Sequence, residues 1–138
     1  MRCEEIGKEA CAELIGGWLE NLPACIASLM EKEAAADLNG LISENGLPLM
    51  VFTADEKLNG IYDVHLFCPR RIKRFDLFEG MRVGKDWLFS REGTRTLLFT
   101  VLSKQTQLKE SLLTNGAVWT GWKYIESGNV FEHWVVQK

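Results

Sequence analysis

The chain has 138 residues, so we expect one domain spanning residues 1–138. It is 46% apolar and 25% charged, as in an ordinary globular protein, and no apolar run approaches the roughly 20 residues of a membrane helix. The net charge of −3 does not attract nucleic acid to the molecule as a whole, so binding of that kind would need a local basic patch.

The cysteines and histidines do not form a metal-binding pattern. The four cysteines are scattered without a CxxC pair, and the only histidines are His65 and His133. We therefore expect no metal site. Acidic residues near the start replace the basic flank and apolar stretch of a secretory signal, so we expect a cytoplasmic protein with reduced cysteines and no membrane association.

Helical periodicity dominates the first part of the chain. Apolar residues recur at four-residue spacing and predict an amphipathic first helix: Ile6, Ala10, Leu14 and Trp18. The segment Asn21–Pro23 combines a good helix cap with a proline suited to a first turn. It predicts the end of that helix and the start of a second, which fades near Asp37–Gly40.

The middle of the chain changes period. Compact or alternating apolar segments predict strands at Leu47–Ala54 and Gly60–Phe67, and a weaker strand at Leu38–Glu44 pairs with the first of these through an Asn-Gly turn. The period then lengthens to that of a helix from about Ile72 to Phe89. Two glycines in this helix lower its intrinsic stability, so we expect them to permit close packing on a sheet.

The last part predicts a strand, a short helix and a hairpin. The strand covers Thr96–Ser103, and the helix lies within Gln105–Gly116, where Asn-Gly forms a left-handed stop. The strands Ala117–Glu126 and Val130–Val136 follow. The full order, ααβββαβαββ, predicts an α/β (α+β) fold with a mixed, mostly antiparallel central sheet flanked by helices.

From Gly60 to Val136 this order resembles that of the GNAT superfamily of acyl-CoA-dependent N-acetyltransferases. The matching features are the basic turn before the long helix, the short helix ending in glycine, and an aromatic hairpin containing Trp119, Trp122, Phe131 and Trp134. The resemblance is closest to the short GNAT-like proteins of tailed bacteriophages. It implies acetyl-CoA as cofactor, an amine substrate or phage structural proteins as partners, and the host cytoplasm or the virion as location. The opposite parity of two of the tryptophans is compatible with a homo-oligomer.

The basic turn is the expected cofactor site, although it departs from the family pattern. GNAT enzymes hold the CoA pyrophosphate on a glycine-rich loop, whereas "CPRRIKRFDLF" contains no glycine before Gly80. Cationic side chains could hold phosphates instead. The candidate cofactor-binding residues are Leu66, Phe67, Cys68, Arg70, Arg71, Lys73, Arg74 and Gln105. A solvated basic turn, or contact with nucleic acid or an acidic protein, are the alternatives.

The short helix lacks the acid that the resemblance implies. The family spacing Asn-x-x-Ala-x-x-x-Tyr-x-x-x-Gly-Phe places Gln105 at the asparagine position and Leu112 at the tyrosine position. Leucine cannot protonate a departing thiolate, so another group or water would have to do so, or no transfer occurs.

A base is also needed, and Asp63 and His65 are the candidate catalytic residues. Strand alternation places both on one face, where they could work together. The alternative is a polar surface pair, and His133 is interpreted as a surface residue of the hairpin. Two functions stay open: an acyl-CoA-dependent N-acetyltransferase, or an inactive GNAT-shaped assembly component of a phage particle.

Overall fold

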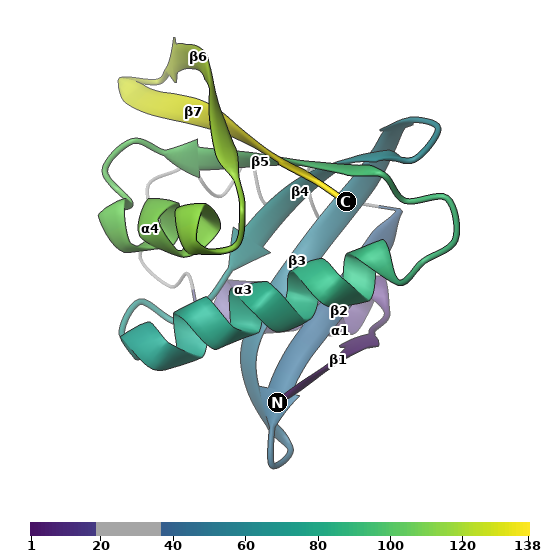
Figure 1. The fold of residues 1–138 in the computed structure, drawn as a ribbon. Coiled ribbons are helices and arrows are strands. Elements are labelled where there is room, and N and C mark those ends of the chain that lie inside the picture. Colours follow the sequence, from purple (N-terminus) through teal and green to yellow (C-terminus); the bar gives the residue numbers. More distant parts are fainter. Residues whose placement is uncertain (19–36) are drawn as a thin grey trace.

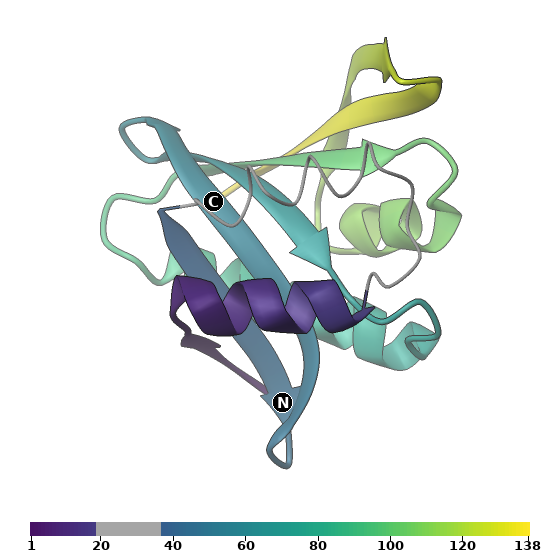
Figure 2. The ribbon, with the colours of Figure 1, turned by 180° about the vertical axis from the view of Figure 1, so that it is seen from behind.

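The computed structural model describes residues 1–18 and 37–138, which form one sheet with helices on both faces (Figures 1 and 2). The strands are β1 (Arg2–Glu5), β2 (Leu38–Glu44), β3 (Leu47–Leu58), β4 (Ile61–Phe67), β5 (Thr96–Leu102), β6 (Val118–Glu126) and β7 (Asn129–Gln137). The helices are α1 (Lys8–Trp18), α3 (Arg74–Phe89) and α4 (Thr106–Thr114).

The described strands form a seven-stranded sheet in the order β1-β2-β3-β4-β5-β7-β6. Every neighbouring pair is antiparallel except β4 and β5, which run parallel with α3 as their crossover. This arrangement confirms the predicted mixed, mostly antiparallel sheet flanked by helices.

Two predictions for the first part of the chain need correction. The predicted order omitted β1, which pairs antiparallel with β2 from Arg2↔Ser43 to Glu5↔Gly40. Its four residues are mostly exposed and lack the apolar alternation that marks a strand. Helix α1 begins at Lys8 rather than Ile6, because the Ile6 N–H donates to the Asn39 carbonyl at 3.0 Å and extends the sheet edge. The predicted second helix lies outside the described residues.

Two element boundaries in the middle also differ. Strand β3 continues past Ala54 to Leu58, because pairing with β4 holds this polar segment extended although its last side chains are exposed. Helix α3 begins at Arg74 rather than Ile72, whose N–H donates to the Pro69 carbonyl at 3.1 Å in the preceding turn.

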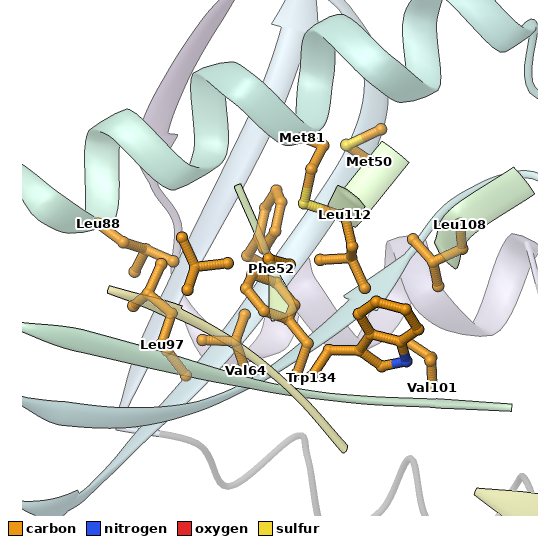
Figure 3. Close-up of a cluster of buried hydrophobic side chains, with 14 of the residues drawn as sticks. Met50, Phe52, Val64, Met81, Leu88, Leu97, Val101, Leu108, Leu112 and Trp134 are labelled. Carbon is orange, nitrogen blue, oxygen red and sulfur yellow. The ribbon is translucent and has the colours of Figure 1, made fainter. Parts of the chain in front are cut away.

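The main core lies on the face of the sheet covered by α3 and α4 (Figure 3). Buried side chains from both helices meet residues of the central strands, including Phe52, Leu97 and Phe99. On the opposite face a smaller cluster joins Cys11 and Ile15 of α1 to buried residues of β3 and β4. Figure 2 shows α1 crossing that face.

The glycines of α3 allow the helix to approach β3 closely, as predicted. A Cβ at Gly80 would lie 2.7 Å from the Met50 side chain, and one at Gly84 would overlap the ring of Phe52. Both strand residues are fully buried, so neither has room to withdraw. The close approach fixes the start of α3 beside the end of β4.

The terminal hairpin contains a bulge that the sequence pattern did not predict. Three residues of β6, numbers 120–122, stand opposite His133 alone. The Thr120 hydroxyl donates to the His133 carbonyl at 3.0 Å and accepts from the Trp122 N–H at 3.1 Å, and Gly121 has a φ of 83° that favours glycine. Trp119 pairs with the core residue Trp134, whereas Trp122 contacts the His133 ring on the other face, so the two tryptophans lie on opposite faces as their parity predicts.

Candidate functional site

The parallel strands β4 and β5 separate partway along their length. Their ladder runs from Ile61↔Thr96 to Val64↔Phe99 and ends there, although β4 continues to Phe67 and β5 to Leu102. The outer edges stay paired, with β3 on one side and β7 on the other, so the two ends turn apart (Figures 1 and 2). We call this feature the β4–β5 divergence. Open α/β sheets bind ligands at such carboxyl ends of parallel strands.

The basic turn lies where β4 leads into α3. The side chains of Arg70, Arg71 and Lys73 are exposed there. Lys73 is the N-cap residue of α3, and its side chain makes no capping hydrogen bond. The first backbone N–H groups of a helix attract anions through their partial positive charge. Exposed cationic side chains and an uncapped helix start therefore suit a phosphate, even without a glycine-rich loop.

Two predicted cofactor-binding residues have their functional groups engaged within the protein. The Arg74 guanidinium forms an ion pair with Glu110 of α4 at 2.7 Å and lies 4.5 Å from the centre of the Phe78 ring. Gln105 accepts a hydrogen bond from the Leu102 N–H at 3.0 Å through its side-chain oxygen. Arg74 thus links the two helices, and Gln105 closes the turn between β5 and α4.

The remaining predicted cofactor residues lie at and just after the free end of β4. Leu66 packs against the main core, whereas the alternating side chain of Phe67 is buried in the α1 cluster. Cys68 is half-buried beside the main core, and burial raises the pKa of its thiol to about 11. The thiol is therefore neutral near pH 7 and is a poor nucleophile.

Asp63 and His65 lie on one face of β4, as predicted from alternation. Asp63 pairs with Leu98 inside the ladder, and His65 follows the last paired residue, Val64. Because Phe67 shares their parity and belongs to the α1 cluster, the two side chains are on the α1 side of the sheet. A carboxylate and an imidazole therefore flank the start of the divergence.

The terminal hairpin also contributes side chains to this face, which the sequence did not predict. The β5–β7 register places His133 opposite Thr100, and the β6–β7 register places Tyr124 opposite Phe131. Together with Trp122 these ring-bearing residues form what we call the hairpin cluster: Trp122, Tyr124, Phe131 and His133. Their membership depends on β7 lying between β5 and β6, which no local pattern reveals.

The rings of the hairpin cluster contact one another. Tyr124 stacks on Phe131 with centroids 5.2 Å apart and lies 5.5 Å from the His133 ring. Trp122 meets His133 edge-on at 6.1 Å. Burial, then the carboxylates of Glu126 and Asp63, raise the pKa of the Tyr124 phenol. The phenol is thus within electrostatic range of a carboxylate on β4.

Helix α4 offers no acid at the position implied by the resemblance. Leu112 is fully buried in the main core (Figure 3). The neighbouring Ser111 hydroxyl is buried too and donates to the Leu108 carbonyl at 2.7 Å. The buried face of α4 therefore serves packing.

Within residues 1–18 and 37–138, no group of three or more His, Cys, Asp or Glu side chains is placed to hold a metal ion. No helix in these ranges is long and apolar enough to cross a membrane. An open pocket of about 290 Å³ lies at the far ends of α3 and α4, away from the divergence, and is lined by residues such as Lys85, Asn115 and Lys138.

No protein-family profile matches the sequence, and no curated protein matches it. Solved structures do match its fold. A GNAT-family acetyltransferase from Streptococcus pneumoniae has a TM-score of 0.64 and 18% identity, over 98% of this chain and 97% of its own. An IAA acetyltransferase from Bacillus cereus has a TM-score of 0.71 and 12% identity, over 99% and 98%.

A spermidine N-acetyltransferase from Vibrio cholerae has a TM-score of 0.74 and 9% identity, over 99% of this chain and 95% of its own. These likenesses extend over nearly the whole of each chain. They include the seven-stranded sheet, and the sequence identities are low. The chain therefore has the fold of the GNAT acetyltransferases.

Proposed function

We propose that the protein is an acyl-CoA-dependent N-acyltransferase that uses acetyl-CoA. The observation that carries the proposal is the β4–β5 divergence, with exposed cationic side chains at the uncapped start of α3 beside it. Arg70, Arg71 and Lys73 hold the phosphates of the cofactor, and the free ends of β4 and β5 flank its thioester arm. Structures of a similar fold, those of the aminoglycoside acetyltransferase AAC(6')-Ib, contain acetyl-CoA or coenzyme A.

The chemistry assigned to this chain is positioning and proton transfer. A neutral primary amine attacks the thioester carbonyl, so a C–N bond forms and the C–S bond breaks. Asp63 or His65 takes the proton that the amine nitrogen loses, directly or through one water. Water protonates the leaving thiolate, because Leu112 has no proton to give. Most of the acceleration then comes from holding the two reactants together.

The first test is the effect of acetyl-CoA on thermal unfolding. A ligand present at 100 times its dissociation constant stabilises the folded state by about 2.7 kcal/mol. We expect acetyl-CoA to raise the unfolding temperature, and S-acetylpantetheine, which lacks the phosphates, to raise it much less. Absence of an acetyl-CoA shift at saturating concentration, together with absence of acetyl transfer, would exclude this function.

An inactive assembly component is the second candidate, in its narrower form a component of a phage particle. The observation that favours it is the exposure of large apolar side chains on the edge strand β6. Val118 is 62% exposed, Trp119 42% and Ile125 75%. Apolar side chains on an open edge suit a partner strand. This candidate predicts co-purification with particles and no response to acetyl-CoA.

A further inference from the structure

The hairpin cluster and the β4 pair Asp63 and His65 share one face of the sheet. Thr100 of β5 is the link between them. It lies directly opposite His133 of β7. It is also the first β5 residue beyond the end of the β4–β5 ladder, just as His65 is the first β4 residue beyond it. A row of polar side chains therefore starts at the divergence and leads through Thr100 to the hairpin.

The stacked rings lie one step beyond this row. Tyr124 and Phe131 form the next pair on this face toward the tip of the hairpin, after His133. Strand rise of about 3.3 Å per residue and strand spacing of about 4.8 Å place the two residues roughly 8 to 12 Å from Thr100. A molecule that reacts at the divergence can thus reach the rings only if it is extended.

Aromatic rings and carboxylates of this kind favour the binding of a cation. The faces of aromatic rings attract ammonium groups, most strongly where water is partly excluded. Tyr124, Phe131 and His133 are half-buried, and Glu126 has the same parity on β6 as Tyr124. Asp63 adds a second carboxylate within electrostatic range of Tyr124. Lys123 pairs with Glu132 and so points to the opposite face.

We propose that the acceptor is an extended aliphatic amine with two amino groups. One amino group, neutral, reacts at the β4–β5 divergence, and the other stays protonated against Tyr124, Phe131 and Glu126. The proposal rests on the proposed function, because it names the acceptor of that same transfer. It assigns specificity to the hairpin, whereas the transfer itself takes place at the strand ends.

The test compares acceptors that differ in the charge of the distal end or in the length of the chain. Acetyl transfer is measured at pH 8, where alkylammonium groups with a pKa of about 10.4 stay protonated. The probes are 1,8-diaminooctane, 8-amino-1-octanol, which has a neutral distal end, and 1,3-diaminopropane, which is too short to span the site. We expect kcat/KM for 1,8-diaminooctane to exceed that for each of the other two about tenfold, with a twofold statistical allowance in the comparison with 8-amino-1-octanol, which has one amine instead of two.

Variants locate the preference. Tyr124→Leu and Glu126→Gln should each reduce the preference for 1,8-diaminooctane over the amino alcohol about three- to tenfold, with the KM for acetyl-CoA unchanged. Tyr124→Phe keeps the ring and should keep most of the preference. Ile125→Ala is the matched control, because Ile125 is 75% exposed and points to the other side of the same strand.

The outcomes separate this inference from the proposed function. Transfer from acetyl-CoA that is equally efficient to 1,8-diaminooctane and 8-amino-1-octanol overturns the diamine acceptor and leaves the transferase intact. If acetyl-CoA gives neither a thermal shift nor transfer, the transferase fails. The cation site is then tested alone by titrating 1,8-diaminooctane into the protein and following the indole N–H resonances by NMR, because Trp122 belongs to the hairpin cluster. A shift that Tyr124→Leu abolishes supports the site, and no shift overturns it.

Discussion

Two strand–turn–helix units, β4–α3 and β5–α4, lie side by side and differ in how each is closed. The β4–α3 turn exposes cationic side chains and leaves the helix start without a side-chain cap. The β5–α4 turn is closed by Gln105, which binds the Leu102 N–H. The helices also pack differently, since α3 meets the sheet through glycines and α4 through leucines.

Under the proposed function, this difference separates a unit that binds the cofactor from a unit that packs the core. Helix α3 lies close to the sheet, so its start is held beside the end of β4 while its N–H groups stay available to an anion. Helix α4, which follows β5, fills the core on the same face of the sheet as α3. The Arg74–Glu110 ion pair joins the two units. We therefore expect substitutions in α4 to change stability, and substitutions in the basic turn to change cofactor affinity.

Truncating the core residue of α4 should have the largest effect. Leu112→Ala removes a fully buried side chain and should lower the free energy of unfolding by about 3 to 4 kcal/mol. Leu113→Ala is the control, because Leu113 is 56% exposed on the same helix and its loss should cost about 0.5 kcal/mol or less. Equal losses in urea denaturation would contradict the packing role of α4.

Adding one methyl group to α3 should have the next largest effect. Gly84→Ala places a Cβ against the buried ring of Phe52 and should cost about 2 kcal/mol, despite the higher helix propensity of alanine. Gly16→Ala in α1 meets nothing within 4 Å and should stabilise the protein by up to about 1 kcal/mol. Chemical denaturation of the pair measures the difference. A stabilising Gly84→Ala would break the comparison of the two helices.

The third prediction concerns cofactor affinity. The double substitution Arg70→Ala and Arg71→Ala should weaken acetyl-CoA binding about tenfold, which is about 1.4 kcal/mol, without lowering the unfolding temperature. Arg74→Ala should weaken it less, because its guanidinium already binds Glu110. Lys57→Ala, an exposed lysine far from the turn, is the control. Calorimetric titration that finds Arg74→Ala the most damaging would show that the ion pair opens to receive the cofactor.

The smallest effect is a pH dependence at the end of β4. Burial raises the pKa of Cys68 from 9.0 to about 11, so its neutral form is favoured by folding. The stability that this preference contributes is complete below pH 9 and is lost as the pH rises toward 11. At pH 9.5 the loss is less than about 1 kcal/mol. The difference in unfolding temperature between wild type and Cys68→Ala should narrow over this range. A constant difference would mean that the thiol is more solvated than its position indicates.

Much of the fold was predictable because its signals are local. The apolar run of β5, the long period of α3 and the Asn-Gly stop after α4 each depend on neighbouring residues, and Gly116 has the expected left-handed φ of 86°. Strand β1 was missed because its pairing with β2, and not its composition, makes it a strand. The polar end of β3 was missed for the same reason.

The candidate site was less predictable because it depends on contacts between distant segments. Alternation correctly placed Asp63 and His65 on one face, but the point where the β4–β5 ladder ends is set by the neighbouring strands. The engagement of Arg74 by Glu110 joins residues on separate helices. Tyr124 could not be singled out, because its approach to Asp63 depends on the position of β7 within the sheet.

The insertion of β7 between β5 and β6 also bears on how the chain assembles during synthesis. Strand β6 is made before β7, yet β7 is its neighbour in the sheet. Until β7 has left the ribosome, β6 lacks its native partner strand, and the main core lacks Trp134. The half of the sheet that contains β1 to β4 can form earlier. The hairpin cluster is therefore completed later than the half of the sheet that contains β1 to β4.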